Sequence, residues 1–320
     1  MSFFRNAVWF CKGLGEYTQS GYLAAAKHFK PEDLDVNCQG KSYMITGANS
    51  GIGKQAALEI AKRGGTIHMV CRNPTAAEEA KTQLMTESKN DDIHVHILDM
   101  SEPRDILRFA AEFTQRFSSL NVLVNNAGCM VNTREITEDG LEKNFATNTV
   151  GTHMITEALI PALSKAEDPR VIIVSSGGML TKKLDLSDLQ SEKMKPFDGT
   201  MVYAQNKRQQ IVMAHKYAEK HPKIHFSTMH PGWADTPAVR SSMPEFYEKM
   251  KNRLRTVEQG GDTIVWLAVA GDASKEKSGS FFQDRKVTSE HLPLAWTQSK
   301  PEEEEQLMGI LNDYYQRFSS

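Results

Sequence analysis

From about residue 42 onward, the chain alternates between short apolar runs and longer segments in which apolar residues recur at helical spacing. The short runs are typical of buried strands, whereas the longer segments are typical of amphipathic helices. The expected strands are Ser42–Thr46, Thr66–Cys71, Ile93–Leu98, Val122–Asn125, Val171–Ser175, Ile224–Met229 and Ser280–Phe282. The expected helices are Ile52–Arg63, Ala76–Thr86, Asp105–Phe117, Leu141–Leu163, Tyr203–Lys220 and Val257–Ala270.

This strand–helix rhythm predicts one α/β domain with a doubly wound, seven-stranded parallel sheet and helices on both faces. Right-handed crossovers leave few other topologies for such a chain. We assign the domain to residues 41–320 and the preceding residues 1–40 to a helical extension. Residues 233–253 interrupt the rhythm between a strand and a helix, and we expect them to form a lid over a substrate cleft.

The composition is that of a globular protein that has no electrostatic preference for nucleic acid. Of the 320 residues, 38 are Lys or Arg and 40 are Asp or Glu, which gives a net charge of −2. The cysteines have no zinc-ligand or disulfide-framework spacing, so we expect a reducing, intracellular compartment. We expect neither secretion nor a spanning helix, and location in the cytoplasm or at a membrane surface. The acidic run Glu302–Glu305 is typical of the start of a solvated helix.

A glycine-rich turn follows the first expected strand and precedes the first helix. Glycines 47, 51 and 53 lie where a backbone must turn tightly and approach a diphosphate, and the helix N-terminus supplies free N–H groups. A purely structural turn is the alternative. As a dinucleotide site in a Rossmann domain, the turn would bind the cofactor through Gly47, Asn49, Ser50, Gly51, Ile52 and Gly53.

The end of the second strand bears on the choice of cofactor. It carries no acidic residue for the adenosine ribose hydroxyls, and it carries Arg72, which suits a 2′-phosphate. We therefore expect NADP. The alternative is that Arg72 only caps the strand end and that NAD is accepted as well.

Tyr203 and Lys207 are four residues apart on an expected helix, and therefore on one face of it. Lowering a tyrosine pKa from ~10 to near 7 takes about 4 kcal/mol, which an ammonium and a nicotinamide charge could supply. Alone, such a pair is usually a surface feature. Here, Ser175 or Ser176 ends a neighbouring strand, and either position suits a hydroxyl that binds the substrate oxygen.

These motifs, with the Asn125–Gly128 turn and Asn148, resemble the short-chain dehydrogenase/reductase family over residues 42–285. The resemblance implies that Tyr203 is the general acid/base, that Lys207 lowers its pKa and that Ser176 orients the substrate oxygen. It also implies that Asn148 supports a water chain to Lys207. It assigns further cofactor contacts to Asp99, Asn126, Ala127, Gly128, Pro231, Gly232 and Thr236, beside Tyr203 and Lys207.

The segment 186–193 resembles the retinol-dehydrogenase-like branch of this family. Segments 8–10 and 229–237 resemble one individual member of it. The bulky lid residues Trp233, Met243 and Phe246 favour an apolar carbonyl or alcohol substrate, such as a lipid, retinoid or steroid. The alternative is that they pack on the body of the protein. A non-catalytic, NADP-binding regulatory protein is the second functional hypothesis.

Three histidines are candidates for chemistry. His230 lies at a strand end, where a structural role is favoured over a catalytic one. His94 and His96 share one face of a strand, but no further ligands follow from the sequence, so no metal site is expected.

The N-terminal segment has an amphipathic helical pattern, with Phe3, Ala7, Phe10 and Leu14 on one face. This helix could dock on the protein's own body, lie on a membrane surface or serve as a transit peptide. Formation of a homo-oligomer is also left open.

Overall fold

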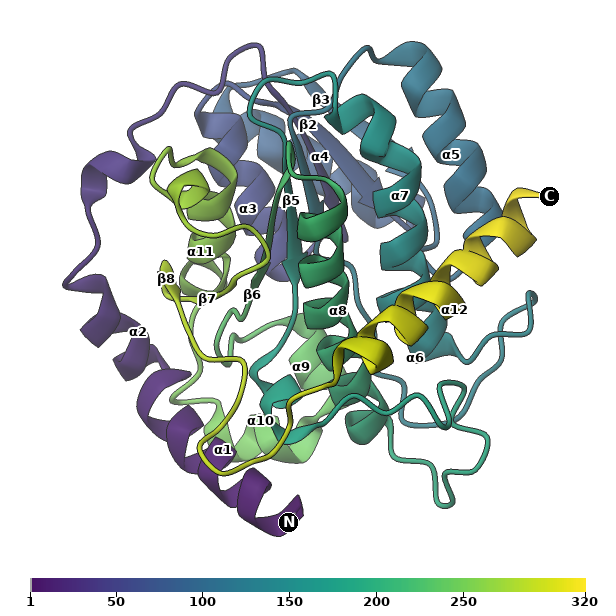
Figure 1. The fold of residues 1–320 in the computed structure, drawn as a ribbon. Coiled ribbons are helices and arrows are strands. Elements are labelled where there is room, and N and C mark those ends of the chain that lie inside the picture. The colour runs from purple at the N-terminus through teal and green to yellow at the C-terminus, as the bar shows by residue number, and fades with distance from the viewer. Residues whose placement is uncertain (1) are drawn as a thin grey trace.

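The computed structural model describes residues 2–320, apart from the side chains of Ser2 and Phe3. The expected place of Phe3 on the apolar helix face therefore lies outside the described residues. One sheet with the strand order β3-β2-β1-β4-β5-β6-β7-β8 forms the centre of the molecule (Figure 1). The strands are β1 (Ser42–Thr46), β2 (Thr66–Cys71), β3 (Ile93–Ile97), β4 (Val122–Asn125), β5 (Arg170–Val174), β6 (His225–Met229), β7 (Phe281–Gln283) and β8 (Lys286–Val287).

The strand order confirms the doubly wound α/β fold. Strands β1 to β7 pair in parallel, and the order reverses between β1 and β4, where open α/β sheets bind their ligands. The sheet has eight strands where seven were expected, because β8 turns back antiparallel on β7. A strand of two residues, Lys286–Val287, is too short to carry an alternating pattern.

The helices lie in two layers, one on each face of the sheet (Figure 1). Helices α3 (Gly51–Lys62), α4 (Pro74–Ser88) and α11 (Val257–Val269) form one core with the sheet. Helices α5 (Pro103–Arg116), α7 (Gly151–Leu163) and α8 (Gly199–Lys220) form the other, which α12 (Pro301–Ser319) completes. Helix α12 begins one residue before the acidic run, as expected.

Capping explains why several helices begin earlier than their apolar periodicity predicts. Asn73 accepts a hydrogen bond from Ala76 N and precedes Pro74 at the first helical position of α4. Asp198 caps α8 through Met201 N, so the helix begins before the predicted start at Tyr203. The long helix expected over 141–163 is interrupted instead: α6 (Lys143–Phe145) leads into a π-helical turn, η2 (Ala146–Val150), and then into α7.

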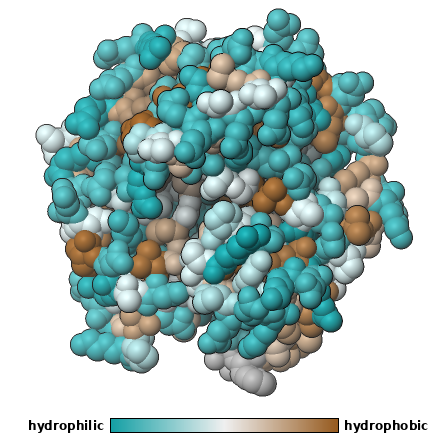
Figure 2. Space-filling view, turned by 180° about the vertical axis from the view of Figure 1, so that it is seen from behind, coloured by the Kyte–Doolittle hydropathy of each residue, from teal (hydrophilic) through white to brown (hydrophobic). Residues whose placement is uncertain are grey.

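The N-terminal extension forms two helices, α1 (Ser2–Glu16) and α2 (Gln19–Ala26), which run along the lower left of the molecule in Figure 1. Helix α1 packs on the 3-10 turn η3 (Gly177–Thr181), which follows β5. None of the helices within residues 2–320 combines the length and apolar character that crossing a bilayer requires. Seen from behind, the surface is mainly hydrophilic, with small separate groups of hydrophobic residues (Figure 2).

Candidate active site

The glycine turn between β1 and α3 has a backbone that side chains would obstruct. Gly47 and Gly51 have φ values of +69° and +54°, in the left-handed region that favours glycine. A Cβ atom on Gly53 would lie 2.3 Å from Asn126 Nδ2 and 2.7 Å from Gly47 O. Ser50 precedes α3 without capping it through its side chain, so the first N–H groups of the helix stay available to an anion. The turn therefore fits the diphosphate of a dinucleotide.

The turn after β4 is fastened directly to the end of β1. Thr46 Oγ1 accepts hydrogen bonds from the backbone N–H groups of Asn126, at 3.0 Å, and Ala127, at 2.9 Å. Asn126 Nδ2 donates to Thr46 O at 2.8 Å. These bonds hold the turn after β4 against the end of β1. The sequence pointed to Thr46 as the residue that leads the glycine turn, but it did not predict this function of its hydroxyl.

Arg72 and Asp99 lie side by side at the carboxyl ends of β2 and β3. Their nearest charged atoms, Arg72 Nη1 and Asp99 Oδ2, are 3.6 Å apart, and the Arg72 side chain is 69% exposed. Asp99 Oδ1 also accepts hydrogen bonds from the backbone and hydroxyl of Ser101. An exposed, loosely paired arginine is free to turn toward an anionic group at the carboxyl ends of these strands.

Tyr203 and Lys207 lie on one face of α8, as expected for residues four apart. Lys207 Nζ lies 5.2 Å from the centre of the Tyr203 ring. The lysine is buried, and its ammonium donates to Val174 O at 2.7 Å and to Gln210 Oε1 at 3.2 Å. Burial lowers the pKa of Lys207 to about 7 and raises the pKa of Tyr203 above its usual range. In the protein alone, the pKa of Tyr203 therefore moves opposite to the expected direction, because burial penalises the phenolate and the nearby Cys129 adds to the rise.

The two serines after β5 have different hydrogen-bonding partners. Ser175 is buried, and its hydroxyl donates to Lys207 O at 2.9 Å. Ser176 is half-buried, and its Oγ accepts from Gly178 N at 3.2 Å. A hydroxyl has one hydrogen to donate, so that of Ser175 is already used, whereas that of Ser176 is left for another acceptor.

Asn148 is joined to Lys207 through Gln210, a residue that was missed at the level of the sequence. Gln210 accepts from Lys207 Nζ, and its Nε2 donates to Asn148 O at 2.6 Å. The Asn148 side chain is bound to both backbone groups of Cys129, with Cys129 N donating at 2.9 Å and Cys129 O accepting at 2.8 Å. A glutamine side chain thus links the Lys207 ammonium to the backbone carbonyl of Asn148. Its position three residues after Lys207, on the same helix face, was the available signal.

Gly128 shows how closely these elements converge. A Cβ atom at this position would lie 3.0 Å from Asn148 Oδ1 and 3.6 Å from Lys207 Nζ. The end of β4, the π-helical turn and α8 therefore meet at Gly128. Such π-helical turns are frequent at functional sites.

The segment after β6 lies against the glycine turn. Gly232 has a φ of +75°, and a Cβ atom there would overlap the Arg255 side chain. Thr236 caps α9 (Pro237–Ser242) and lies 3.4 Å from the place of a Cβ on Gly51. Pro231, Gly232 and Thr236 are thus brought to the same edge of the sheet as the glycine turn.

The aromatic residues expected to line a substrate cleft are directed largely at one another. Trp233 is 7% exposed, and its ring centroid lies 5.1 Å from that of Phe246 on α10 (Pro244–Met250). It also lies 5.7 Å from the centroid of Trp9 on α1. Of the two interpretations of these lid residues, the contacts favour packing on the body.

The histidines considered for chemistry are occupied in packing. His230 is buried, and its Nδ1 accepts from Gly177 N at 2.9 Å, while burial holds its pKa far below the usual range. His96 bonds to His68, which its sequence position did not single out. Within residues 2–320, no group of three or more His, Cys, Asp or Glu side chains is arranged to hold a metal ion.

Comparisons with known proteins agree with this geometry. A family model described as short chain dehydrogenase matches residues 41–186. Dehydrogenase/reductase SDR family member 12 from Homo sapiens is 58% identical over 318 residues, which are 99% of this chain and 100% of that protein. Retinol dehydrogenase 12 from Homo sapiens is 31% identical over 258 residues, which are 79% of this chain and 81% of that protein.

Solved structures show the same fold at low sequence identity. A short chain dehydrogenase from Shigella flexneri complexed with NADP has a TM-score of 0.62 at 20% identity, over 78% of this chain and 99% of that chain. Salutaridine reductase from Papaver somniferum has a TM-score of 0.60 at 20% identity, over 76% of this chain and 99% of that chain. The resemblance to one individual protein, which segments 8–10 and 229–237 predicted, is confirmed by the identity with family member 12.

Proposed function

This chain belongs to the short-chain dehydrogenase/reductase family, and from this premise we propose that it transfers a hydride between NADP(H) and a carbonyl/alcohol pair. The observation that carries the proposal is the grouping of these side chains at the carboxyl edge of the sheet: Lys207 lies beside the Tyr203 ring, Lys207 and Asn148 both lie beside Gly128, and Ser176 lies beside Gly178, which also faces Ala204 on α8. This edge lies beside a glycine turn that fits a diphosphate.

NADP is the proposed cofactor, and nicotinamide supplies the hydride chemistry when bound. The glycine turn at 47–53 would hold the diphosphate, and the exposed Arg72 would bind a 2′-phosphate. Lys207 uses two of its three N–H groups on Val174 and Gln210, so the third is available to a ribose hydroxyl. The short chain dehydrogenase from Shigella flexneri, which shares the fold, was solved in complex with NADP, and this supports the choice.

In this proposal, Tyr203 donates a proton to the substrate oxygen during reduction, and Ser176 donates a hydrogen bond to the same oxygen. Ser176 suits this function better than Ser175, whose hydroxyl is committed to Lys207 O. The raised pKa of Tyr203 favours its protonated form, which is the form needed for reduction. In the oxidative direction, the positive charge of Lys207 would stabilise the phenolate.

The proposed substrate is an apolar carbonyl or alcohol. The names of the retinol dehydrogenase relatives support this class. The sequence suggested that Trp233 and Phe246 would contact an apolar substrate. These rings pack against each other instead, so they support this substrate class less than expected. All-trans-retinal is therefore the first probe, and smaller apolar ketones and aldehydes extend the range.

The test is the variant Tyr203→Phe, measured with NADPH and all-trans-retinal. We expect cofactor affinity within about twofold of the wild type and turnover lowered by about 100-fold or more, since general acid/base catalysis contributes roughly 10²–10⁴. Tyr315→Phe, a half-buried tyrosine on α12, is the matched control and should keep full turnover. Wild-type turnover by Tyr203→Phe would refute the assigned acid/base. Tight NADPH binding without turnover on any probe would favour a regulatory, non-catalytic protein.

A further inference from the structure

Tyr17, at the junction of α1 and α2, anchors the N-terminal extension in the interior of the protein. It has no exposed surface, and its ring packs edge-to-face on His230 with a centroid distance of 4.3 Å. Its carbonyl accepts from Trp233 N at 2.8 Å. The extension therefore reaches the segment that follows β6, beside the expected cofactor contacts Pro231 and Gly232.

His230 connects this aromatic contact to the catalytic edge. Its Nδ1 accepts from Gly177 N, the amide immediately after Ser176, so its proton is on Nε2. A Cβ atom on Gly177 would lie 2.9 Å from both His230 Nε2 and Tyr17 Cε2. Gly177 is thus enclosed by a histidine from the end of β6 and a tyrosine from the extension, and substituting it would move one of them.

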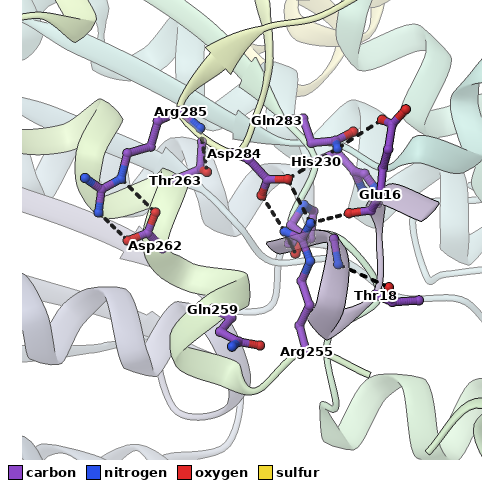
Figure 3. Close-up of polar contacts among 12 residues, drawn as sticks. Glu16, Thr18, His230, Arg255, Gln259, Asp262, Thr263, Gln283, Asp284 and Arg285 are labelled. Atoms are coloured by element: carbon purple, nitrogen blue, oxygen red, sulfur yellow. Dashed lines mark hydrogen bonds and ion pairs between the residues drawn. The ribbon is translucent and has the colours of Figure 1, made fainter. Parts of the chain in front are cut away.

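A buried ion pair fixes the extension in this position (Figure 3). Arg255 is 1% exposed and forms a two-point contact with Asp284, at 2.6 and 2.9 Å. It also donates to Glu16 O at 2.7 Å and to Pro231 O at 3.3 Å. One guanidinium therefore ties the end of α1 to the segment that carries His230 and Gly232.

We propose that Tyr17 and His230 are positioning residues, through which the N-terminal extension holds Ser176 in its working place. Tyr17 keeps His230 against Gly177, and the bond from Gly177 N fixes the backbone that carries the Ser176 hydroxyl. Catalysis is sensitive to such geometry, since a misplacement of about 1 Å can lower a rate roughly 100-fold. The inference rests on the proposed function, because it assigns these residues to the same reaction.

The first test uses no substrate. Hydrogen–deuterium exchange of overlapping peptides within 174–182 measures the protection of the short segment that contains the Gly177 amide. We expect faster exchange in Tyr17→Leu and His230→Leu than in the wild type, and near wild-type protection in His230→Asn, whose side-chain oxygen can replace Nδ1 as an acceptor. The Tyr17 hydroxyl has no hydrogen-bond partner among residues 2–320, so Tyr17→Phe should preserve the protection.

The second test measures kcat with NADPH and all-trans-retinal. Tyr17→Leu and His230→Leu should lower kcat by about tenfold or more while NADPH affinity stays within about twofold, and His230→Asn should restore most of kcat. Tyr217→Leu is the matched control: it removes an equally buried tyrosine that packs on His153 and Phe226, so its kcat per folded molecule should not fall.

The outcomes separate this inference from the proposed function. If Tyr203→Phe abolishes turnover while Tyr17→Leu and His230→Leu keep it, the positioning role is refuted and the proposed function stands. Equal losses of kcat in Tyr17→Leu and Tyr217→Leu would also refute the positioning role, since a general effect of lost packing would then explain both. If Tyr17→Leu fails to fold, the two His230 variants decide. A kcat of His230→Asn that is no higher than that of His230→Leu overturns the inference.

Discussion

The ion pair between Arg255 and Asp284 should contribute far more to stability than an exposed pair of the same geometry. Its side chains are 1% and 8% exposed, and the guanidinium binds both carboxylate oxygens and two backbone carbonyls. Removing one partner leaves an uncompensated charge in the interior, at a cost of about 3–5 kcal/mol. We therefore expect Arg255→Met and Asp284→Leu each to lower the free energy of unfolding by about that amount.

The lid offers a matched control. Arg240 contacts both carboxylate oxygens of Asp235 at 2.7 and 2.8 Å, and its side chain is 57% exposed. Exposed pairs contribute about 0–1 kcal/mol, because water screens the attraction. Arg240→Met should therefore leave the urea midpoint close to that of the wild type.

Urea unfolding followed by tryptophan fluorescence measures these differences, and a double-mutant cycle isolates each pair. Arg255→Met combined with Asp284→Leu should recover much of the stability lost by either alone, because neither charge is then buried without a partner. A loss from Arg255→Met no larger than that from Arg240→Met would refute this account of the buried pair. Simple addition of the losses from the two buried substitutions would refute it equally.

Three further predictions follow from the other sites. Arg72→Gln should weaken NADPH binding by roughly 10–100-fold and leave NADH binding unchanged, since one charge-assisted hydrogen bond is worth about 1.5–3 kcal/mol. Titrations in which both cofactors lose the same affinity would contradict this prediction. Burial lowers the pKa of His68 to about 3, below an unfolded value of ~6.5, so its stabilisation is complete above about pH 6.5 and lost as the pH falls. Urea midpoints at about pH 7 and about pH 5 should differ less in His68→Phe than in the wild type. Gln210→Met should lower kcat about tenfold with little effect on NADPH affinity, and an unchanged kcat would show that the link from Lys207 to Asn148 is dispensable.

The electrostatics of Lys207 and Tyr203 depend on burial more than on their mutual contact. The protein partners of the ammonium, Val174 O and Gln210 Oε1, are neutral oxygens, and its pKa falls to about 7. The pKa of the phenol rises for the same reason. A positive charge placed beside them would favour phenolate, whereas the protein alone favours the neutral phenol. This setting suits proton donation to a carbonyl oxygen in the reductive direction.

Most of the fold could be predicted because its signals are local. Each strand from β1 to β6 coincides with a short apolar run. The predicted bounds of these strands differ from the observed bounds by at most one residue at either end. The glycine turn was recognisable because left-handed backbone at Gly47 and Gly51 restricts the residue type. Helix starts were placed less well, since a cap such as Asp198 lies outside the apolar periodicity.

The residues that the sequence did not reveal act through contacts between distant segments. Arg255 donates to the backbone carbonyl of Glu16, 239 positions earlier in the chain. Because the acceptor is a backbone atom, the residue type at position 16 gives no sign of this contact. Tyr17 follows an amphipathic helix, and its pattern gives no sign that it enters the interior beside His230. Periodicity reports which face of an element is buried within a window of about 11–18 residues, but not which distant segment covers it. The association of the extension with the catalytic edge is therefore a property of the assembled fold, and only substitutions on both sides of the contact can measure it.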